Sequence, residues 1–535
     1  MRLDNYQSIL KQGLPALLLV NLIYSCSPVD ESLLNKEQTA SLFDLMISDI
    51  EFYDAEMRAT RDNTKEVSWE AYKAFHEKKW DRGVSPEELN ELFSEFRRGY
   101  LNGHSHLVYL YPLEETNDGY TEYRSSINLG YSYPDITFYN VENGNKIVSI
   151  NNKPIEEIFW NFSNYETTKI RPNAVLNAFS SSFNQRSLRV DGKVPFVIDY
   201  EDQKADSVYY TPVEPSNEDI FLDGIDLSGY QDWETIEKGY KVALLKKDDV
   251  ALIKIKNFIY MNGFGGDVDC GDPFEEIADS TMCKDVKLLI NGLQTIIEKT
   301  DFLIFDLQDN LGGNENTPFV KMFCPKPFND TRVQYRKSKL LEDPEIREAL
   351  NYFAPNAENW YTSLQEKGIY SKVEYGDFLP ERGDFCRGDS VCGVTPVNPN
   401  NDLTADFSKI IILTNEATAS SADDFVFRFK EFGGAFIAGQ PHSADLTYAL
   451  VSVVYYVDEQ GNPDRVFYGN AQEKPGIPGE ELFKIDIPYS RTLDKDRNML
   501  QGNPLPMDLL VPITPENFDH IKKDVLDQAI DHFCR

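Results

Sequence analysis

The segment KIIILTNEATASSADDFVFRFKEFGGAFIAGQP, residues 409–441, constrains the fold more than any other stretch of the chain. An apolar run, a turn of small and polar residues, a helical pattern and a second apolar run follow one another in it. The same alternation precedes it: VALIKIKNF (250–258) and DFLIFDLQDNLGGN (301–314) are predicted strands, and residues 284–299 form a predicted helix. Strands that alternate with helices predict an α/β fold with a largely parallel sheet. Functional residues then lie at the carboxyl ends of the strands.

Two turn motifs, DNLGGN and TNEATASSAD, come directly after predicted strands of this sheet. In the second motif, Ser420 stands between small residues at the start of a predicted helix, where backbone N–H groups have no helical partner. A serine at this place is suited to nucleophilic catalysis, with amide donors from the helix start and from Gly312 and Gly313 for an oxyanion. The alternative is that Ser420 only caps the helix and the glycines only turn the chain. The absence of a Gly-x-Ser-x-Gly pattern disfavours an α/β-hydrolase.

The first 26 residues predict a signal peptide, and cleavage of the lipoprotein type is the preferred interpretation. Arg2 and Lys11 precede the apolar run GLPALLLVNLIYSC, which is too short to span a membrane as a mature helix. The run ends at Cys26 in a sequence close to a bacterial lipobox, although Tyr24 is larger than that motif prefers. We therefore expect an exported protein, either lipid-anchored through Cys26 on the periplasmic face of a bacterial envelope or secreted after ordinary cleavage.

An even number of cysteines remains if Cys26 carries lipid. Exported chains commonly pair their cysteines, and six cysteines allow fifteen pairings. The short intervening loops favour Cys270–Cys283 and Cys386–Cys392, with free buried thiols as the alternative, and the spacing fits no zinc site. The remaining cysteines are Cys270, Cys283, Cys324, Cys386, Cys392 and Cys534.

The length of 535 residues predicts several domains, and the net charge of −35 restricts the partners. A polyanion is repelled by phosphate, so nucleic acid and anionic membrane surfaces are excluded as partners of the polypeptide itself. The negative charge has two interpretations: the protein works in a saline habitat, or its acidic surface serves solubility alone. The acidic loop 265–276 lacks the spacing of a calcium loop, and NGFGG (262–266) lacks the context of a nucleotide site. We predict no metal and no cofactor.

The segment SPEELNELFSEFRRGYLNGHSHL (85–107) predicts a helix with Ser85 at the N-cap and Glu88 closing a capping box. The helix ends at Asn102-Gly103, which places His104 and His106 in the following turn. From about residue 126 to residue 215 the sequence pattern changes to one that predicts short strands, and an acidic linker follows. The apolar face of the helix carries Leu89, Leu92, Phe93, Phe96 and Tyr100.

The two turn motifs together resemble those of the C-terminal processing (tail-specific) serine peptidases and their tricorn-like relatives of clan SK. The resemblance implies that Ser420 is the nucleophile, that Asp423 stands where the family has Glu, and that the amides of Gly313 and Ser421 form the oxyanion hole. GNKIVSINNKPIEEI (144–158) is similar to the family's PDZ-like module, and GNPLPMDLLVPITPENFDHIKKDVLDQAI to its closing segment. The resemblance covers residues from about 85 to 530.

The fold class implied is α/β, with a crotonase/ClpP-like α/β core, an N-terminal helical region and a PDZ-like β-rich module. The expected parts are a signal peptide (1–26), an N-terminal helical region (27–125), the PDZ-like module and linker (126–235), the first part of the peptidase core (236–324), an irregular insertion (325–405), and the second part of the core with a C-terminal helix (406–535).

The general base is the part of the site that the motifs assign least directly. In the tail-specific branch a turn delivers a catalytic lysine, but Asp445 occupies that position here, which rules out a Ser–Lys dyad there. In the tricorn-like branch a histidine follows the N-terminal helices, and LNGHSHL places His104 on it. A neutral imidazole is a suitable base near neutral pH. His106 is the close alternative, and His442 a third.

The family's glutamate near the closing segment, which orients the histidine, has Gln501 as its nearest counterpart here. An amide stabilises an imidazolium less than a carboxylate does. The expected function is that of an exported serine endopeptidase that cleaves peptides or unfolded protein tails. The alternative, favoured by Asp445 and Gln501, is a catalytically impaired protein on the same scaffold that binds peptides or other ligands.

Overall fold

The structure, a computed structural model, describes residues 33–55, 69–97, 107–111, 122–125, 129–135, 137–150, 153–154, 196–201, 206–208, 210–213, 224–258, 292–293, 295–296, 299–313, 328–329, 331–347, 357–383, 396–397, 409–430, 434–447, 450–469, 473–494 and 496–533. The predicted signal peptide, the two histidines His104 and His106, the loop 265–276 and all seven cysteines lie outside the described residues.

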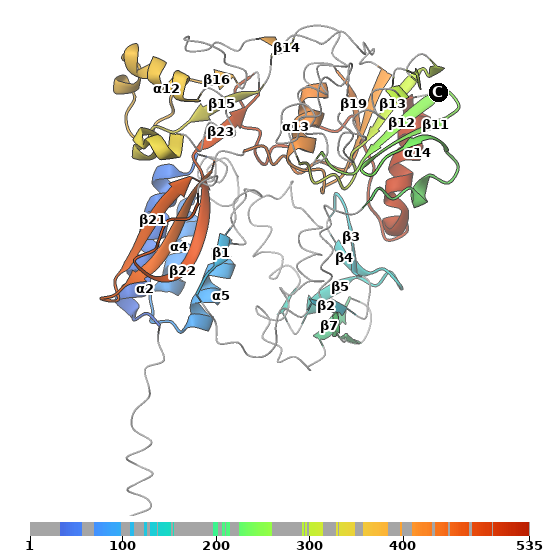
Figure 1. Cartoon of the computed structure of the whole chain (residues 1–535). Coiled ribbons are helices and arrows are strands. Elements are labelled where there is room, and N and C mark those ends of the chain that lie inside the picture. Colours follow the sequence, from blue (N-terminus) through green and yellow to red (C-terminus); the bar gives the residue numbers. More distant parts are fainter. Residues whose placement is uncertain are drawn as a thin grey trace, which may run out of the picture.

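The centre of the fold is a seven-stranded sheet with the order β10-β11-β12-β13-β18-β19-β24 (Figure 1). The strands from β12 to β24 are parallel, and β10 and β11 add an antiparallel edge. This sheet confirms the α/β core predicted from the alternating pattern. Its strands are β10 (Glu234–Lys238), β11 (Val242–Lys247), β12 (Val250–Ile255), β13 (Phe302–Asp306), β18 (Ile410–Thr414), β19 (Phe436–Gly439) and β24 (Leu509–Leu510).

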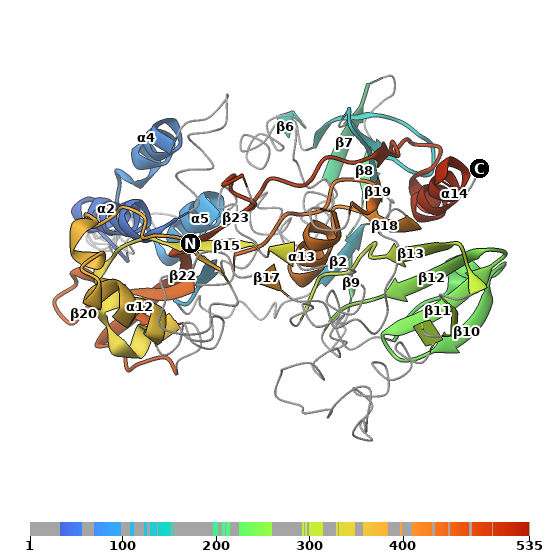
Figure 2. The same cartoon turned by 90° about the horizontal axis from the view of Figure 1, so that it is seen from above.

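Two helices cover opposite faces of this sheet, α13 (Ser421–Arg428) and α14 (Ile521–Phe533) (Figure 2). Successive side chains of a strand point to opposite faces. Ile412 accordingly packs in the cluster that contains Phe425 of α13, and Leu413 in the one that contains Val525 of α14. Burial on both faces explains the uninterrupted apolar run of β18.

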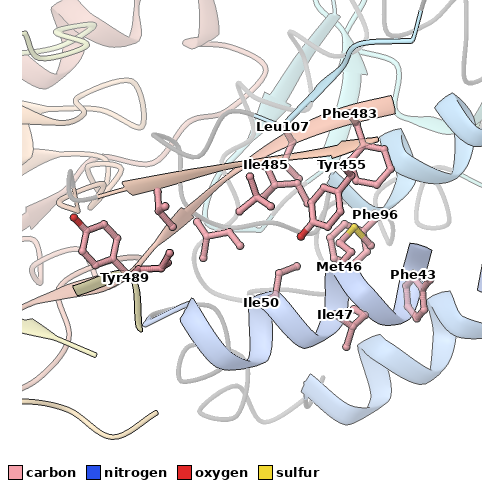
Figure 3. Packing of buried hydrophobic residues seen from close by; sticks show 14 of the residues in the cluster. Phe43, Met46, Ile47, Ile50, Phe96, Leu107, Tyr455, Phe483, Ile485 and Tyr489 are labelled. Carbon is pink, nitrogen blue, oxygen red and sulfur yellow. The ribbon is translucent and has the colours of Figure 1, made fainter. Parts of the chain in front are cut away.

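A second, antiparallel sheet has the order β1-β22-β20-β21 and is built from β1 (Leu107–Tyr109), β22 (Gly479–Pro488), β20 (Leu450–Asp458) and β21 (Pro463–Gly469). The helices α2 (Lys36–Tyr53), α4 (Trp69–Trp80) and α5 (Pro86–Arg97) share one hydrophobic core with it. Figure 3 shows Met46 and Ile50 of α2 facing Tyr455 of β20. The N-terminal helices are thus held by strands from the last fifth of the chain.

The predicted start of α5 is present in the structure. Glu88 Oε2 accepts the Ser85 N–H at 3.0 Å, and Ser85 Oγ accepts the Glu88 N–H at 3.3 Å, which is the reciprocal capping box. Of the predicted apolar face, the described residues Leu89, Leu92, Phe93 and Phe96 are all buried.

Residues 325–405, expected to be irregular, contain regular elements. Helix α12 (Ala357–Glu366) packs Trp360 beside Tyr335 of β15 (Arg332–Tyr335), which pairs with β16 (Arg382–Gly383) and β23 (Ser490–Leu493). A short pair is formed by β14 (Phe328–Asn329) and β17 (Pro396–Val397). The short amphipathic helix was missed because Gly, Pro and Asn dominate the composition around it.

Short antiparallel strands follow β1, as the alternating pattern predicts. They are β2 (Glu122–Ser125), β3 (Leu129–Ser132), β4 (Thr137–Asn140), β5 (Ile147–Ile150), β6 (Lys153–Pro154), β7 (Phe196–Tyr200), β8 (Asp206–Val208) and β9 (Tyr210–Val213). Tyr133 pairs with Ile513, so this part is joined to the segment before α14. Within the ranges that the structure describes, no helix is both long and apolar enough to cross a membrane.

The core between α2 and the second sheet contains an aspartate. Asp49 is 2% exposed; its Oδ2 accepts a hydrogen bond from Tyr455 at 3.0 Å and lies 2.6 Å from Arg465 Nε. Burial raises the pKa of Asp49 from 3.8 to about 6, and the positive charge of Arg465 opposes the rise. The protonated carboxyl is therefore favoured by folding.

We predict that Asp49→Asn flattens the acid side of the stability profile. Because the folded pKa of Asp49 exceeds the unfolded one, its contribution is fully present below the unfolded pKa and is lost as the pH rises to about 6. The wild type should lose about 3 kcal/mol of unfolding free energy relative to the variant across this window. Urea unfolding from about pH 4 to about pH 7 measures it. Asp44→Asn, at an exposed position of α2, is the control; parallel profiles for wild type and Asp49→Asn would contradict the prediction.

Candidate active site

The loop after β13 is fastened by Asn310, which is fully buried. Its Nδ2 donates to the Ile255 carbonyl at 3.0 Å, and its Oδ1 accepts the Gly312 N–H at 2.9 Å. Its own carbonyl accepts the Ala419 N–H at 2.9 Å. One asparagine thus connects the end of β12, the glycine turn and the residue before Ser420.

The glycine turn lies directly against the predicted nucleophile. Gly312 has φ +90° and Gly313 φ +135°, which are conformations that residues with a Cβ rarely adopt. A Cβ on Gly312 would stand 2.6 Å from the Ser420 Cβ and 2.8 Å from the Ser421 nitrogen. The two sequence motifs, more than a hundred residues apart, therefore form one site at the carboxyl ends of adjacent parallel strands.

Ser420 stands immediately before α13 in a strained conformation, with φ +59° and ψ −126°. Such a backbone costs a non-glycine residue about 1–3 kcal/mol and persists only where surrounding contacts impose it. Among these contacts is a hydrogen bond from the Ser420 N–H to Asp423 Oδ2 at 2.9 Å. Ser420 is half-buried at the mouth of the helix.

The carboxylate of Asp423 is the centre of the hydrogen-bond network around Ser420. It is completely buried and accepts from both the start of α13 and the turn 442–445. Hydrogen bonds to charged groups are stronger than neutral ones, and several donors together offset the cost of burying the charge. The donors are Ser420 N (2.9 Å), Ser443 Oγ (2.9 Å) and Asp445 N (2.7 Å) on Oδ2, and His442 Nδ1 (2.6 Å) and Ala444 N (3.0 Å) on Oδ1.

His442, the third candidate for the base, has both ring nitrogens engaged. Nδ1 faces Asp423, and Nε2 accepts the Leu505 N–H at 3.0 Å. The ring therefore carries its proton on Nδ1, and its remaining lone pair is directed to the backbone rather than to Ser420. We assign His442 a structural role, connecting Asp423 to the closing segment.

Gln501 and Asp445, which both depart from the family pattern, are hydrogen-bonded to each other. Gln501 Nε2 donates to Asp445 Oδ1 at 2.9 Å, and Gln501 Oε1 accepts the Leu446 N–H at 2.8 Å. Both side chains are buried. No single motif in the sequence indicated this pair, which joins two turns 56 residues apart.

The loop of residues 415–420, which carries the predicted nucleophile Ser420 and is called the nucleophile loop below, is also held from the β-rich part of the chain. Tyr131 of β3 donates a hydrogen bond to Glu416, and burial raises the pKa of Glu416 while the hydrogen bond from Tyr131 opposes the rise. Asn415 and Asp309 join the two loops reciprocally: Asn415 Nδ2 donates to Asp309 Oδ1 at 2.8 Å, and Asn415 Oδ1 accepts the Asp309 N–H at 3.0 Å. Asp309, Asn415 and Glu416 lie inside the two predicted motifs, but the sequence indicated no role for them or for Tyr131, because ordinary polar residues carry no signal of their contacts.

The described fold and site define a class of α/β protein with a serine at a helix start beside a Gly-Gly turn. Residues 249–449 match the model of Peptidase family S41, which spans both turn motifs. Over this segment the chain is therefore similar to peptidase family S41, which supports a serine-type peptidase. The resemblance drawn from the sequence is confirmed at the level of the family.

Solved structures show the same fold over most of the chain. The structure of mature CPAF complexed with lactacystin is 14% identical, with 93% of this chain and 98% of that chain covered at a TM-score of 0.60. A second structure of mature CPAF is 14% identical, with 92% and 96% covered at a TM-score of 0.58. No curated protein matches the chain. At these identities the structural likeness concerns the fold alone.

We predict that Gly312→Ala destabilises the protein more than Gly376→Ala does. Both glycines have φ +90°, so alanine meets the same backbone strain at each. At Gly376 the added Cβ would meet only Arg336 Nη2 at 3.8 Å, whereas at Gly312 it would meet the backbone of the nucleophile loop. Overpacking there should cost about 1–3 kcal/mol beyond the strain. Urea unfolding of the two variants measures the difference in their unfolding free energies. Equal losses of stability would contradict the predicted clash between the added Cβ at position 312 and the nucleophile loop.

Proposed function

We propose that the protein is an exported serine endopeptidase that cleaves peptides or unfolded protein tails through an acyl-enzyme on Ser420. The observation that carries the proposal is the position of Ser420, strained at a helix start and in contact with the Gly312-Gly313 turn. Strain of this kind in a non-glycine residue is concentrated at functional sites. The family match over 249–449 supports the reaction class.

The chemistry proposed is acyl transfer. Ser420 Oγ attacks the peptide carbonyl and its proton passes to an imidazole, while the N–H groups of Gly313 and Ser421 receive the oxyanion. The tetrahedral intermediate collapses, the amine leaves with the proton from the imidazolium, and an ester to Ser420 remains. Water, deprotonated by the same imidazole, then releases the acid product.

His104 is proposed as the base, with His106 as its rival. Both belong to the segment between α5, which ends at Arg97, and β1, which begins at Leu107. The two ends of this segment are fixed in the core that α5 and β1 share with β22. His442 is set aside because its ring nitrogens bind Asp423 and the Leu505 N–H.

A peptide substrate follows from the family, and the net charge of −35 disfavours a nucleic-acid partner. The strands around residues 144–158 are proposed to be a PDZ-like module that presents an extended peptide by strand addition. Membrane attachment, if present, is proposed to be through lipid on Cys26 alone. The competing function is peptide binding without catalysis, which Asp445 at the family's lysine position favours.

We predict that a fluorophosphonate probe labels the ectodomain that starts at residue 27. Ser420→Ala should abolish labelling, and His104→Ala should reduce it about a thousandfold or more because the nucleophile loses its base. Ser421→Ala is the matched control, since only its backbone N–H is used, and His106→Ala should retain labelling. Rates should rise with pH on the acid side of the profile as the imidazole becomes neutral.

Cleavage of an unfolded polypeptide with a free or an amidated C-terminus then tests the substrate class. Loss of cleavage on amidation identifies tail recognition, and equal cleavage identifies internal sites. A folded wild type that no fluorophosphonate labels between about pH 6 and about pH 9 would refute the peptidase and favour the binding protein.

A further inference from the structure

A buried ion pair lies at the carboxyl ends of β12 and β13. Lys254 and Asp306 are direct partners in the parallel pairing of these strands, and Lys254 Nζ lies 3.1 Å from Asp306 Oδ1. The Asp306 side chain is completely buried and that of Lys254 is 12% exposed. Tyr230 donates a hydrogen bond to the other carboxylate oxygen of Asp306. The sheet and Tyr230 therefore fix the position of the pair.

The ion pair binds the chain where it leaves β13. Asp306 Oδ1 accepts the Gln308 N–H at 3.0 Å, and Lys254 Nζ donates to the Gln308 carbonyl at 2.8 Å. Hydrogen bonds to charged groups are stronger than those between neutral groups. Both backbone groups of Gln308 are thus held by charges. The next residue, Asp309, has a φ of +62°, which few non-glycine residues adopt. The pair therefore sets the direction in which the chain enters the glycine turn.

The peptide unit between Gln308 and Asp309 connects the ion pair to the nucleophile loop. Its carbonyl accepts from Lys254, and its N–H donates to Asn415 Oδ1 at 3.0 Å. Asn415 Nδ2 donates back to Asp309 Oδ1 at 2.8 Å. A cation on the carbonyl polarises the amide and strengthens the hydrogen bond that its N–H donates. Lys254 therefore acts on the contact that joins the glycine turn to the nucleophile loop.

The two proposed oxyanion donors lie on opposite sides of this contact. The Gly313 N–H belongs to the glycine turn, and the Ser421 N–H follows the nucleophile loop directly. The two segments are close, since a Cβ on Gly312 would stand 2.8 Å from the Ser421 nitrogen. Donors stabilise an oxyanion only when both stand at hydrogen-bond distance from the place where it forms. A shift of one segment against the other would misalign them.

We propose that Lys254 is a positioning residue of the reaction. Together with Asp306 it fixes the peptide unit that follows Gln308. Through the contact of this unit with Asn415 it sets the register of the two oxyanion donors. The inference rests on the proposed peptidase function and deepens it. Lys254 takes no part in proton transfer in this role and keeps its charge throughout.

The test is Lys254→Met, which keeps the apolar stem of the side chain but removes its charge and its donors. We expect kcat for the unfolded polypeptide with a free C-terminus to fall about tenfold to a hundredfold, with little change in KM. The reason is that misaligned donors weaken binding of the transition state and not of the substrate. Fluorophosphonate labelling should slow by a similar factor. Lys254→Arg restores a cation with several N–H donors and should recover most of the rate.

Lys484→Met is the matched control. Lys484 Nζ also lies 3.1 Å from a buried aspartate, Asp486, but both residues belong to β22 of the second sheet. We expect this variant to lose stability in urea unfolding and to keep the kcat of the wild type. An equal fall of kcat in Lys254→Met and Lys484→Met would be a general effect of breaking a buried ion pair and would overturn the inference.

A double variant, Lys254→Met/Asp306→Asn, keeps the test decisive if Lys254→Met does not fold because a buried carboxylate has lost its cation. It removes both charges and keeps an acceptor for the Gln308 N–H, but the Gln308 carbonyl still lacks the Lys254 donor. We expect kcat to stay about tenfold or more below that of the wild type. A folded double variant with kcat within about threefold of the wild type overturns the inference.

Fluorophosphonate labelling separates failure of this inference from failure of the proposed function. A wild type that the probe does not label refutes the peptidase itself. A labelled wild type with an equally fast labelling of folded Lys254→Met refutes the positioning role alone.

Discussion

The buried carboxylate of Asp423 is the interaction on which the geometry of the site depends. Its donors come from two chain segments that are separated in sequence by α13 and β19, namely the residue before α13 and the turn 442–445. Burying a charge is costly, and these donors together offset that cost and fix both segments. The strained backbone of Ser420 is one consequence, because the Ser420 N–H must reach Asp423 Oδ2.

The core and the central motifs could be predicted because they are local. The run Ile410–Leu413 reads as a strand buried on both faces, and the small residues around Ser420 indicate a helix start at the end of that strand. Parallel pairing of β13 with β18 then brings their carboxyl ends together without further information. Ser85 and Glu88 form their capping box for the same reason, since they are only three positions apart in the chain.

The rest depends on contacts between distant segments, which a single sequence does not record. Nothing in α2 indicates that Ile50 packs in the same core as Tyr455, four hundred residues away. No sequence pattern indicates that Gln501 pairs with Asp445, or that Tyr131 donates a hydrogen bond to Glu416. His442 illustrates the limit most directly: its position made it a candidate base, and only its partners Asp423 and Leu505 reveal a structural role.

The nucleophile loop is held from three directions, and each support has a different physical character. Asn310 holds it through neutral hydrogen bonds from the neighbouring strand end, Asp423 through a buried charge, and Tyr131 through a contact from the β-rich part of the chain. Donors aimed at a developing oxyanion are effective only when they need not reorganise during the reaction. Under the proposed function, a loop with several independent supports would meet that condition. The strain at Ser420 is then maintained by the whole of its surroundings, which include a part of the chain remote from the α/β core in sequence.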